Sequence, residues 1–404
     1  EIFNKAGLFY SRRVGAMPSG YYDVRDFASA GSDWEIVKNP SVTQLYNATK
    51  FSGRNKNKLG IGIFNAVAAP MDAKIHNRVT GKDSTIRTSG LTNYNILVFD
   101  QALKGRSFIT LTNTNVIRNG AGRDANVTAL DVAFYNKANT YAFNGTARYS
   151  KIWSSSPYDG YKFGKVSGNW RFFVLGNVES KRYDPNDLGI LTAPNELTYR
   201  VKGSYNQFKP TDNFIQYSYS LENRLSYLYE PYGYSRYDIT ATGFWIFKNF
   251  WDVSVKTQLS PASNHDYFEL RTDGRYLKYP LNYIADFSGS TDSRKKLYVR
   301  FSGVFARAPK FDNSYYGGGL GFRFRFSNKF TLDLQMDGHK ENNNLGYAFA
   351  RETNGEPIVG FRDVKERINV LSGIYNFTPR LNLTLRARHY WNEVKYLSFH
   401  NVTT

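Results

Sequence analysis

The chain has 404 residues, with 53 Lys and Arg against 34 Asp and Glu, which gives a formal net charge of +19. It has no cysteine, so disulfide scaffolds and thiolate metal sites are excluded, and it has no apolar run of about 18 residues, which excludes a helical membrane protein. The 31 Tyr and 30 Phe residues favour β-strands, and such enrichment is typical of the aromatic girdles of membrane barrels.

Segments in which apolar and polar residues alternate recur along the whole chain, and each predicts a strand because successive strand side chains point to opposite faces. A first strand is expected at 5–15 and a long loop at 16–40. Later strands are expected in pairs, each joined by a short polar turn: 43–53 with 58–69, 91–100 with 106–118, 124–135 with 140–153, 161–166 with 170–183, 196–208 with 214–229, 234–247 with 251–259, 281–289 with 296–308, and 366–377 with 381–391. The other longer loops are expected at 70–90, 184–195, 260–276 and 341–365.

The stretch 315–340 shows the alternation most clearly. Arg323 and Arg325 are interleaved with phenylalanines, and a turn at 327–329 leads into a second alternating series. The apolar members are Phe322, Phe324, Phe326, Phe330, Leu332, Leu334 and Met336. A soluble sandwich also has one apolar face, but it seldom needs strands this long or so many charged side chains opposite that face. A transmembrane β-barrel needs both, because lipid covers one face and water the other.

The order of turns and loops favours the same fold. Short turns and longer loops alternate, as they do in a barrel with short periplasmic turns. We therefore predict an all-β protein, a transmembrane antiparallel outer-membrane β-barrel of about 18–22 strands, in a bacterial outer membrane. Residues 1–404 are expected to form this barrel as a single domain, with the loops 16–40 and 341–365 at the same, extracellular end. No signal peptide is visible, so we expect a processed or truncated piece of a longer protein.

The excess of basic residues calls for a partner of opposite charge. Lys and Arg are spread singly through the strand-like segments and no nucleic-acid motif is present, so nucleic acid is not an expected partner. Phosphate-bearing lipid headgroups outside the barrel and anions inside its lumen account for the charge better.

The alternation also assigns side chains to the two faces. In the last predicted strand Leu383 and Leu385 should face lipid, which leaves Arg386 and Arg388 in the lumen. The choice of which alternate residues face lipid is constrained, because a charged side chain turned to lipid near mid-membrane costs about 2–4 kcal/mol. The predicted lumen-lining residues are Arg148, Lys256, Arg300, Arg323, Arg325, Asp333, Arg386 and Arg388. Their expected carboxylate partners are Asp252, Asp333 and Asp337.

Candidate catalytic and metal-binding residues are few. No pair of histidines has a metal-ligand spacing such as HExxH, so we predict no metal or cofactor site from them. The five histidines are His76, His265, His339, His389 and His400. No serine has a recognisable nucleophile context beside His265 and Asp266, so no catalytic residues are predicted. The loop DPNDLG at 184–189 offers oxygen ligands but lacks the alternating ligands of a calcium loop, and a tight Asx or Pro turn is expected instead.

Four separated segments resemble one known family. They are EIFNKAGLFYSRRVG at 1–15, LTNYNILVFDQ at 91–101, DPNDLG at 184–189 and DSRKK at 292–296. This family consists of functionally uncharacterised Bacteroidota outer-membrane proteins, which carry a carbohydrate-binding-like domain of the xylanase type followed by a large C-terminal barrel. The resemblance spans essentially the whole chain and implies location and architecture, but no catalytic residues. The carbohydrate-binding-like domain and the last strands expected after Trp391 are absent, which again suggests a truncated piece.

Two functions from different classes remain open at this point. The first is a passage or assembly protein: a porin-like channel, an export conduit, or the membrane subunit of a larger outer-membrane complex. The alternative is an outer-membrane enzyme that acts on lipid or glycan. The wide lumen and the lack of a catalytic constellation favour the first. Expected partners are outer-membrane lipid and lipopolysaccharide, with other outer-membrane proteins, surface lipoproteins and glycans as further candidates.

The expected lumen also needs an occupant. A barrel of this strand number encloses more space than its side chains fill, so the lumen is either water-filled or plugged. The loops 16–40 and 341–365 are the expected plugs. An open lumen rich in Arg and Lys should be anion-selective.

Overall fold

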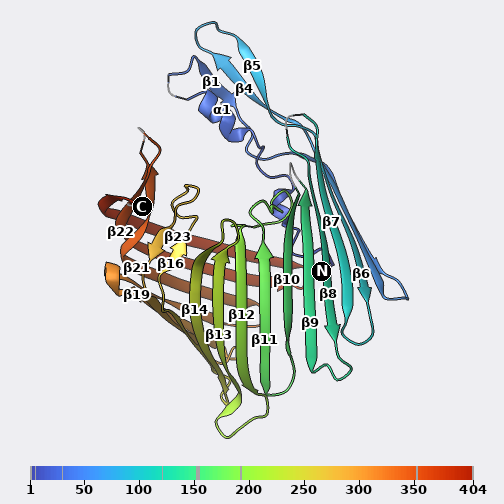
Figure 1. Cartoon of the computed structure of the whole chain (residues 1–404), viewed down its shortest axis with the longest axis vertical. Coiled ribbons are helices and arrows are strands. Elements are labelled where there is room, and N and C mark those ends of the chain that lie inside the picture. The colour runs from blue at the N-terminus through green and yellow to red at the C-terminus, as the bar shows by residue number, and fades with distance from the viewer. Residues whose placement is uncertain are drawn as a thin grey trace. The chain divides into compact units, whose positions relative to one another are not determined.

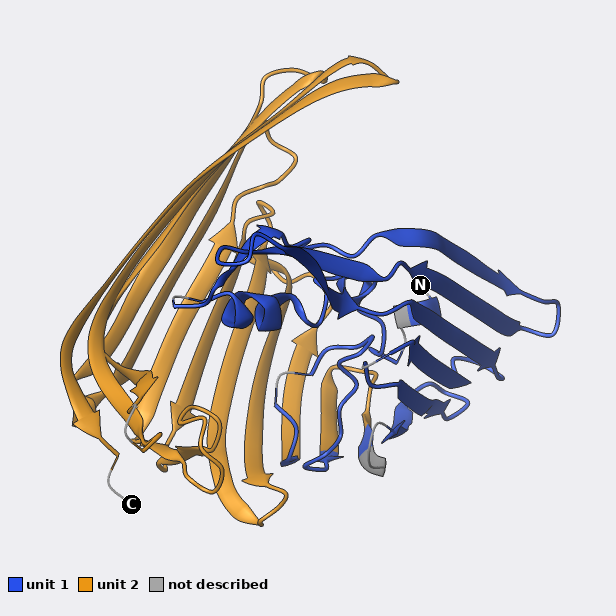
Figure 2. Cartoon of the chain, turned by 90° about the horizontal axis from the view of Figure 1, so that it is seen from above, with its two compact units in different colours: residues 1–163, 176–197 blue, residues 164–175, 198–404 orange. Residues whose placement is uncertain are grey.

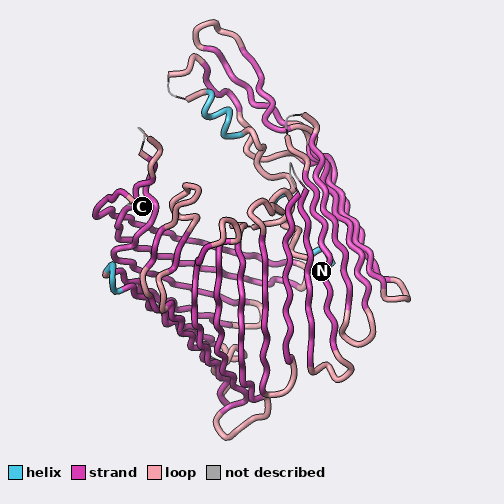
Figure 3. Tube along the Cα trace, viewed as in Figure 1, coloured by secondary structure: helices cyan, strands magenta, loops and turns pink. Residues whose placement is uncertain are grey.

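The structure is a computed structural model that describes residues 2–4, 6–29, 31–120, 122–151, 155–191, 193–351 and 354–402. Glu1, Lys5 and Trp153, which bound predicted segments, lie outside the described residues. The described chain is all-β, as predicted, with a single short α-helix, α1 (Tyr21–Phe27) (Figure 1 and Figure 3). Within this described part, no helix is long and apolar enough to cross a membrane.

The chain divides into two compact units. Unit 1 comprises residues 1–163 and 176–197, and unit 2 comprises residues 164–175 and 198–404 (Figure 2). Three strands contain residues of both units: β10 (Ser155–Lys165), β11 (Trp170–Glu179) and β12 (Glu196–Gln207).

Unit 1 contains an antiparallel sheet whose strands alternate apolar and polar residues, the pattern of a strand with two different faces. The strands pair in the order β2–β3–β6–β7–β8–β9. Their bounds are β2 (Leu45–Arg54), β3 (Leu59–Ala68), β6 (Thr92–Ala102), β7 (Phe108–Arg118), β8 (Ala125–Tyr135) and β9 (Tyr141–Lys151). Each confirms a predicted strand, with its ends shifted by a few residues.

The predicted first strand at 5–15 is wrong. The start of the chain instead forms two 3₁₀ helices, η1 (Ile2–Asn4) and η2 (Ser11–Arg13). Phe3 and Leu8 are each only 1% exposed, because Phe3 packs on β3, β6 and β7 and Leu8 packs on β8. The apolar residues of this segment are therefore satisfied by burial against the sheet and not by strand pairing.

A second segment, 183–191, covers the same part of the unit 1 sheet. Leu188 joins Phe3 in one hydrophobic cluster, and its carbonyl accepts a 2.6 Å hydrogen bond from the backbone N–H of Tyr10. The strand residues beneath the two segments are small or apolar: Ala66, Ala68, Tyr94, Ile96, Val98, Val116, Val127 and Ala129. Gly62 permits the close approach, because a Cβ there would lie 2.9 Å from the Ile2 Cγ2 atom.

A satellite sheet in unit 1 corrects two further predictions. The expected loops 16–40 and 70–90 supply α1 and three strands, β1 (Trp34–Lys38), β4 (Met71–Asn77) and β5 (Asp83–Ser89), which pair in the order β1–β4–β5. The cluster is small: Val24, Ala73 and Ile75 are buried, with Trp34 and Ile86 packed against them. The described residues of 16–40 thus form part of a small folded layer with its own core, and not a loop without secondary structure.

Unit 2 contains the longest strands. They pair antiparallel in the order β13–β14–β15–β18–β19–β20–β21–β22–β23 (Figure 1). Their bounds are β13 (Phe214–Leu228), β14 (Gly233–Phe247), β15 (Asp252–Ser260), β18 (Asn282–Ser290), β19 (Leu297–Ala308), β20 (Asn313–Arg325), β21 (Phe330–Ala350), β22 (Pro357–Thr378) and β23 (Leu381–Asn401). A two-stranded ribbon of β16 (Asn264–Asp266) and β17 (Leu277–Tyr279) lies within the predicted loop region 260–276 and just after it, and η3 (Pro309–Phe311) connects β19 to β20.

The predicted loop 341–365 is wrong for most of its length. β21 continues to Ala350 and β22 begins at Pro357, so only a short connection separates them. The pairing register shifts between Glu341 and Asn344, where Asn343 has a φ of 52°. Such a bulge adds a residue to one strand and changes the phase of its alternation. The pattern beyond Lys340 is therefore out of phase, and it resembles a loop in the sequence.

Closure of the sheet is not confirmed. Among the described residues, β2 has β3 as its hydrogen-bonded neighbour strand, β23 has β22, and the sheets are not closed into a barrel. Of the twenty-three strands in the described part of the chain, eighteen lie outside the two small sheets.

Candidate functional site: the charged face of unit 2

The strands of unit 2 present two chemically different faces. Cross-strand register places Leu297, Phe324, Leu332, Gly373 and Leu385 in one row across β19 to β23. The neighbouring row, one residue along each strand and hence on the opposite face, consists of Tyr298, Arg323, Asp333, Ser372 and Arg386. We call these the apolar face and the charged face.

Asp333 is the centre of the charged face. Its two carboxylate oxygens accept hydrogen bonds from Arg300 Nη2 at 2.6 Å and from Arg323 Nε at 3.3 Å. Arg323 also lies over the ring of Tyr298, at 5.1 Å from its centroid. One carboxylate bridging two guanidinium groups leaves an excess positive charge, and the half-buried geometry holds the three side chains in fixed positions.

Two other predicted cations, one in each unit, also have carboxylate partners. Lys256 Nζ lies 3.7 Å from Asp286, and in unit 1 Arg148 Nη2 lies 3.8 Å from Asp131 on the adjacent strand. Of the expected carboxylate partners, Asp333 forms ion pairs, whereas Asp337 accepts a hydrogen bond from Gln335 at 2.8 Å. Asp252 accepts a hydrogen bond from Ser290.

Three predicted cations have no ion-pair partner within the described ranges. Arg325, Arg386 and Arg388 are exposed and form no salt bridge there, and Arg388 lies 5.4 Å from the ring centroid of Tyr390. These three side chains are free to attract an anion from solution.

The sequence reasoning missed two cations on β12. Arg200 and Lys202 both approach Glu222 of β13, at 3.8 Å and 3.9 Å. The sequence does contain the pattern that would have indicated them, because these cations alternate with Tyr199 and Val201, whose side chains are exposed.

The loop 184–189 is held by an ionic cluster of unit 1. Asp184 lies 2.8 Å from Arg123, and Asp187 lies 2.8 Å from Arg118 and 3.2 Å from Arg123. Burial raises the pKa of Asp184, but hydrogen bonds from the Asn186 backbone and from Arg123 outweigh it, so the pKa is lowered. The 2.9 Å hydrogen bond from the Asn186 N–H to the Asp184 side chain confirms the predicted Asx turn. The carboxylates thus face guanidinium groups, and the described residues contain no cluster suited to a metal ion.

The second turn motif, DSRKK, is also structural. Asp292 accepts hydrogen bonds from Arg294 Nε at 2.9 Å and Nη2 at 2.8 Å, and these lower the pKa of Asp292 to about 2. The Arg294 guanidinium lies 3.5 Å from the ring centroid of Phe250, which joins this turn to the one before β15.

The histidines do not assemble a hydrolytic triad in the described part of the chain. His265 stacks on Tyr276 at 4.1 Å between ring centroids, and burial together with Lys278 lowers its pKa. Ser398 Oγ lies 2.8 Å from His400 Nε2, but no carboxylate is hydrogen-bonded to His400 within the described ranges. A serine hydrolase needs that third group to orient the base.

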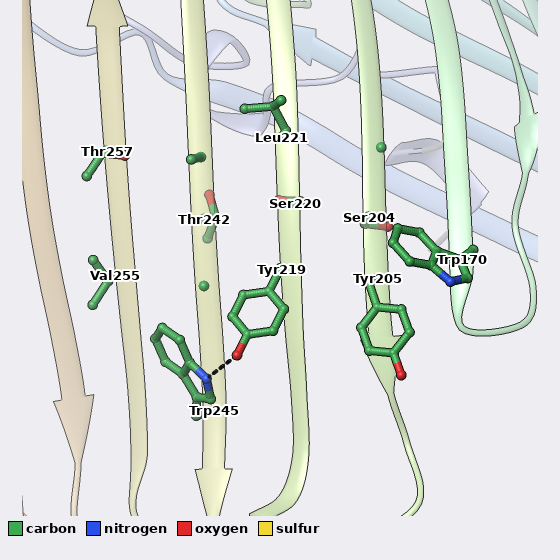
Figure 4. Close-up of a pocket in the computed structure, with 13 residues that line it drawn as sticks. Trp170, Ser204, Tyr205, Tyr219, Ser220, Leu221, Thr242, Trp245, Val255 and Thr257 are labelled. Carbon is green, nitrogen blue, oxygen red and sulfur yellow. Dashed lines mark hydrogen bonds between the residues drawn. The ribbon is translucent and has the colours of Figure 1, made fainter.

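The apolar face carries an aromatic-walled depression of about 710 Å³ (Figure 4). Trp170, Tyr205, Tyr219 and Trp245 project over it, and Trp245 Nε1 donates a 3.1 Å hydrogen bond to the Tyr219 hydroxyl. Small residues form its floor, among them Gly203, Ala241 and Gly243. Exposed aromatic rings around small residues are more typical of a surface that meets lipid than of one that meets water.

Comparisons with known proteins place the chain in one family. A search of curated proteins found no match. A family model described as a domain of unknown function (DUF5916) matches residues 1–404. The chain therefore belongs to the DUF5916 family, a family of unknown function.

Proposed function

We propose that the strands span a bacterial outer membrane, with the apolar face toward lipid and the charged face toward a water-filled interior. The observation that carries this proposal is the opposition of the two faces along the same strands. Many large apolar side chains of one face are exposed, for example Leu320 at 46%, Phe305 at 42% and Leu385 at 60%. A soluble protein rarely leaves so extended an apolar surface open to water.

The dimensions of the apolar face support this proposal. Phe326, Phe330 and Tyr375 form an aromatic cluster beside the short turn that joins β20 to β21. The ring centroid of Phe330 lies 5.1 Å from that of Phe326 and 6.0 Å from that of Tyr375. Along β21 this face is apolar from Phe330 to Met336, and Lys340 is the first charged residue of β21 on it. At a rise of about 3.4 Å per residue and a tilt of about 40°, the step from Phe330 to Lys340 spans about 26 Å along the membrane normal. The lipid-facing band of a membrane barrel is about 25 Å tall.

We further propose that the sheet is closed in the membrane. β2 and β23 each have one hydrogen-bonded neighbour among the described residues, so their outer edges leave N–H and C=O groups unpaired. Unpaired backbone groups in hydrocarbon cost several kcal/mol each, so each edge should take a second neighbour once the strands are in lipid.

The function that best suits this architecture is an anion-attracting passage. Arg325, Arg386 and Arg388 supply fixed positive charge without an ion-pair partner in the described residues, and such charge raises the local concentration of anions. The segments 2–14 and 183–191 would fill part of the interior, in place of the loops expected from the sequence. The resemblance to outer-membrane proteins with a carbohydrate-binding-like domain supports this location and makes surface glycans a candidate ligand of a larger protein. The enzymatic alternative has no comparable support.

Conductance in planar lipid bilayers tests the passage. The full chain should conduct with a preference for chloride over potassium, and deletion of residues 2–14 should raise the conductance. Replacing Arg325, Arg386 and Arg388 with Gln should reduce the preference, because it removes the unpaired cations while leaving the Asp333 network in place.

The matched control replaces three cations on the opposite face, Lys340, Lys365 and Arg367, with Gln. This control should keep the anion preference. Absence of conductance both in the full chain and after the deletion would refute the passage, and a membrane scaffold within a larger complex would replace it.

A further inference from the structure

Charged residues appear on the apolar face toward the start of β22 and toward the end of β21 and β23. Register places Gly318, Gly338, Arg367 and Trp391 in one row of this face. The next row of the same face consists of Tyr316, Lys340, Lys365 and Glu393. We call Lys340, Lys365 and Arg367 the outer basic cluster, since they share a face with Leu334 and Leu371 and not with Asp333.

The cluster borders a depression of about 880 Å³ on this face. Gly318 and Gly338 lie opposite each other in its floor, where the absence of side chains leaves room. The rings of Tyr316 and Trp391 stand at its sides, and His389 lies beside them. The site thus combines cations, flat aromatic rings and an open floor.

The charges of the cluster are only partly balanced. Lys365 Nζ lies 3.6 Å from Glu393, both side chains being 46% exposed. The Lys340 ammonium lies 6.0 Å from the ring centroid of Tyr316 and forms no salt bridge within the described residues. Arg367 is exposed and has neither an ion pair nor a side-chain hydrogen bond in the described part of the chain.

Two further carboxylates of β22 lie near the cluster. Glu366 also lines the depression and accepts a 2.8 Å hydrogen bond from the Tyr390 hydroxyl. Asp363 accepts a 3.1 Å hydrogen bond from the backbone N–H of Asn343. The three cations Lys340, Lys365 and Arg367 outnumber the carboxylates Glu366 and Glu393 at the depression, which leaves a net positive charge there.

The depth of the cluster matches the level of lipid headgroups. Arg367 pairs with Gly338, eight residues beyond Phe330, and Lys340 lies ten residues beyond it. With the same rise and tilt, these rows lie about 21 and 26 Å from the aromatic cluster along the membrane normal, on either side of the far boundary of a band of about 25 Å. Trp and Tyr side chains are enriched at this boundary, because one part of each ring system is apolar and the other is wet.

We propose that the outer basic cluster binds the phosphate-bearing headgroup of a membrane lipid. Arg367 provides the planar fork of donors that suits phosphate oxygens, and Lys340 provides a second positive charge. The acyl chains of the lipid would lie along the adjoining apolar residues Met336 and Leu334. This inference rests on the proposed membrane-spanning function.

Native mass spectrometry of the detergent-solubilised full chain tests the headgroup site. Phosphatidic acid, diacylglycerol and inorganic phosphate are the three probes. The wild-type protein should retain phosphatidic acid in preference to diacylglycerol, which has the same chains without phosphate. The variant with Lys340→Gln, Lys365→Gln and Arg367→Gln should retain phosphatidic acid less, by about fivefold for each cation removed. The variant with Arg325→Gln, Arg386→Gln and Arg388→Gln, which changes the charge equally on the opposite face, should bind phosphatidic acid like the wild type.

Two results would overturn the inference. One is equal retention of phosphatidic acid by the wild type and the outer-cluster variant. The other is binding of inorganic phosphate as tight as that of phosphatidic acid, which would make the site one for a free anion. Protease protection in phosphatidylcholine vesicles separates these failures from failure of the proposed function. If the wild-type protein does not insert into the vesicles, the membrane-spanning function is refuted. If it inserts, but the outer-cluster variant retains phosphatidic acid as well as the wild type does, only the headgroup site is refuted.

Discussion

Leu334 and Gln335 offer a sharp test of the two faces, because they are neighbours in β21 with opposite expected surroundings. Leu334 pairs with Phe322 and Leu371 on the apolar face, whereas Gln335 is exposed on the charged face. Leu334 lies four residues beyond Phe330, about 10 Å along the membrane normal by the rise and tilt used above, which is close to mid-membrane. Leu334→Arg should therefore destabilise the folded protein in lipid by about 2–4 kcal/mol, or about 30- to 800-fold in the folding equilibrium. Gln335→Arg should change stability by no more than about 0.5 kcal/mol, because its side chain enters water.

The measurement is equilibrium urea unfolding of the protein refolded into phospholipid vesicles, followed by the fluorescence of its six tryptophans. Both variants add the same side chain to the same strand, so strand propensity and total charge are matched between them. Equal losses of stability at the two positions would refute the assignment of the apolar face to lipid. A larger loss at Gln335 would show that the faces are reversed.

Three further predictions follow from individual contacts. A membrane-impermeant thiol reagent should label Arg325→Cys faster than Phe324→Cys in vesicles, because only the former side chain should face water, and the reverse order would contradict the face assignment. Phe3→Ala should lower the stability of unit 1 by about 3–5 kcal/mol in urea unfolding, since Phe3 is 1% exposed beneath the loop 183–191, and a loss within error of zero would mean that the segment does not pack there. Burial raises the pKa of Asp184, but its hydrogen bonds lower it by more, so the pKa is lower in the folded than in the unfolded protein. Asp184 therefore stabilises the fold fully above the unfolded-state pKa of about 3.9, and this stabilisation is lost as the pH falls through the folded-state pKa. Asp184→Asn should reduce the fall in the free energy of unfolding at acidic pH. An unchanged fall in the variant would exclude the Asp184 carboxylate as its cause.

The sequence predicted which residues lie on the charged face, but not which of them form ion pairs with one another. Alternation alone assigned Arg323, Asp333 and Arg386 to one face, and the observed register places them in one row. That Asp333 bridges two arginines, one ten residues away and the other thirty-three, depends on the stagger of neighbouring strands. The stagger is set by turns and bulges along both strands, so local alternation carries no information about it.

The sequence by itself determined the strands and their faces, because alternation with period two is a property of each segment and needs no partner. The hairpins of the two large sheets were largely found in this way, whereas the β4–β5 hairpin falls within a predicted loop. Only the tertiary structure decided that residues 2–4 and 6–14 cover the unit 1 sheet instead of joining it. Phe3 and Leu188 are far apart in the chain, and an alternating apolar segment satisfies its side chains equally well by pairing in a sheet or by burial against one. The tertiary structure also decided that the loop 341–365 continues the strands, because the bulge at Asn343 changes the phase of the pattern while the ladder of hydrogen bonds resumes beyond it.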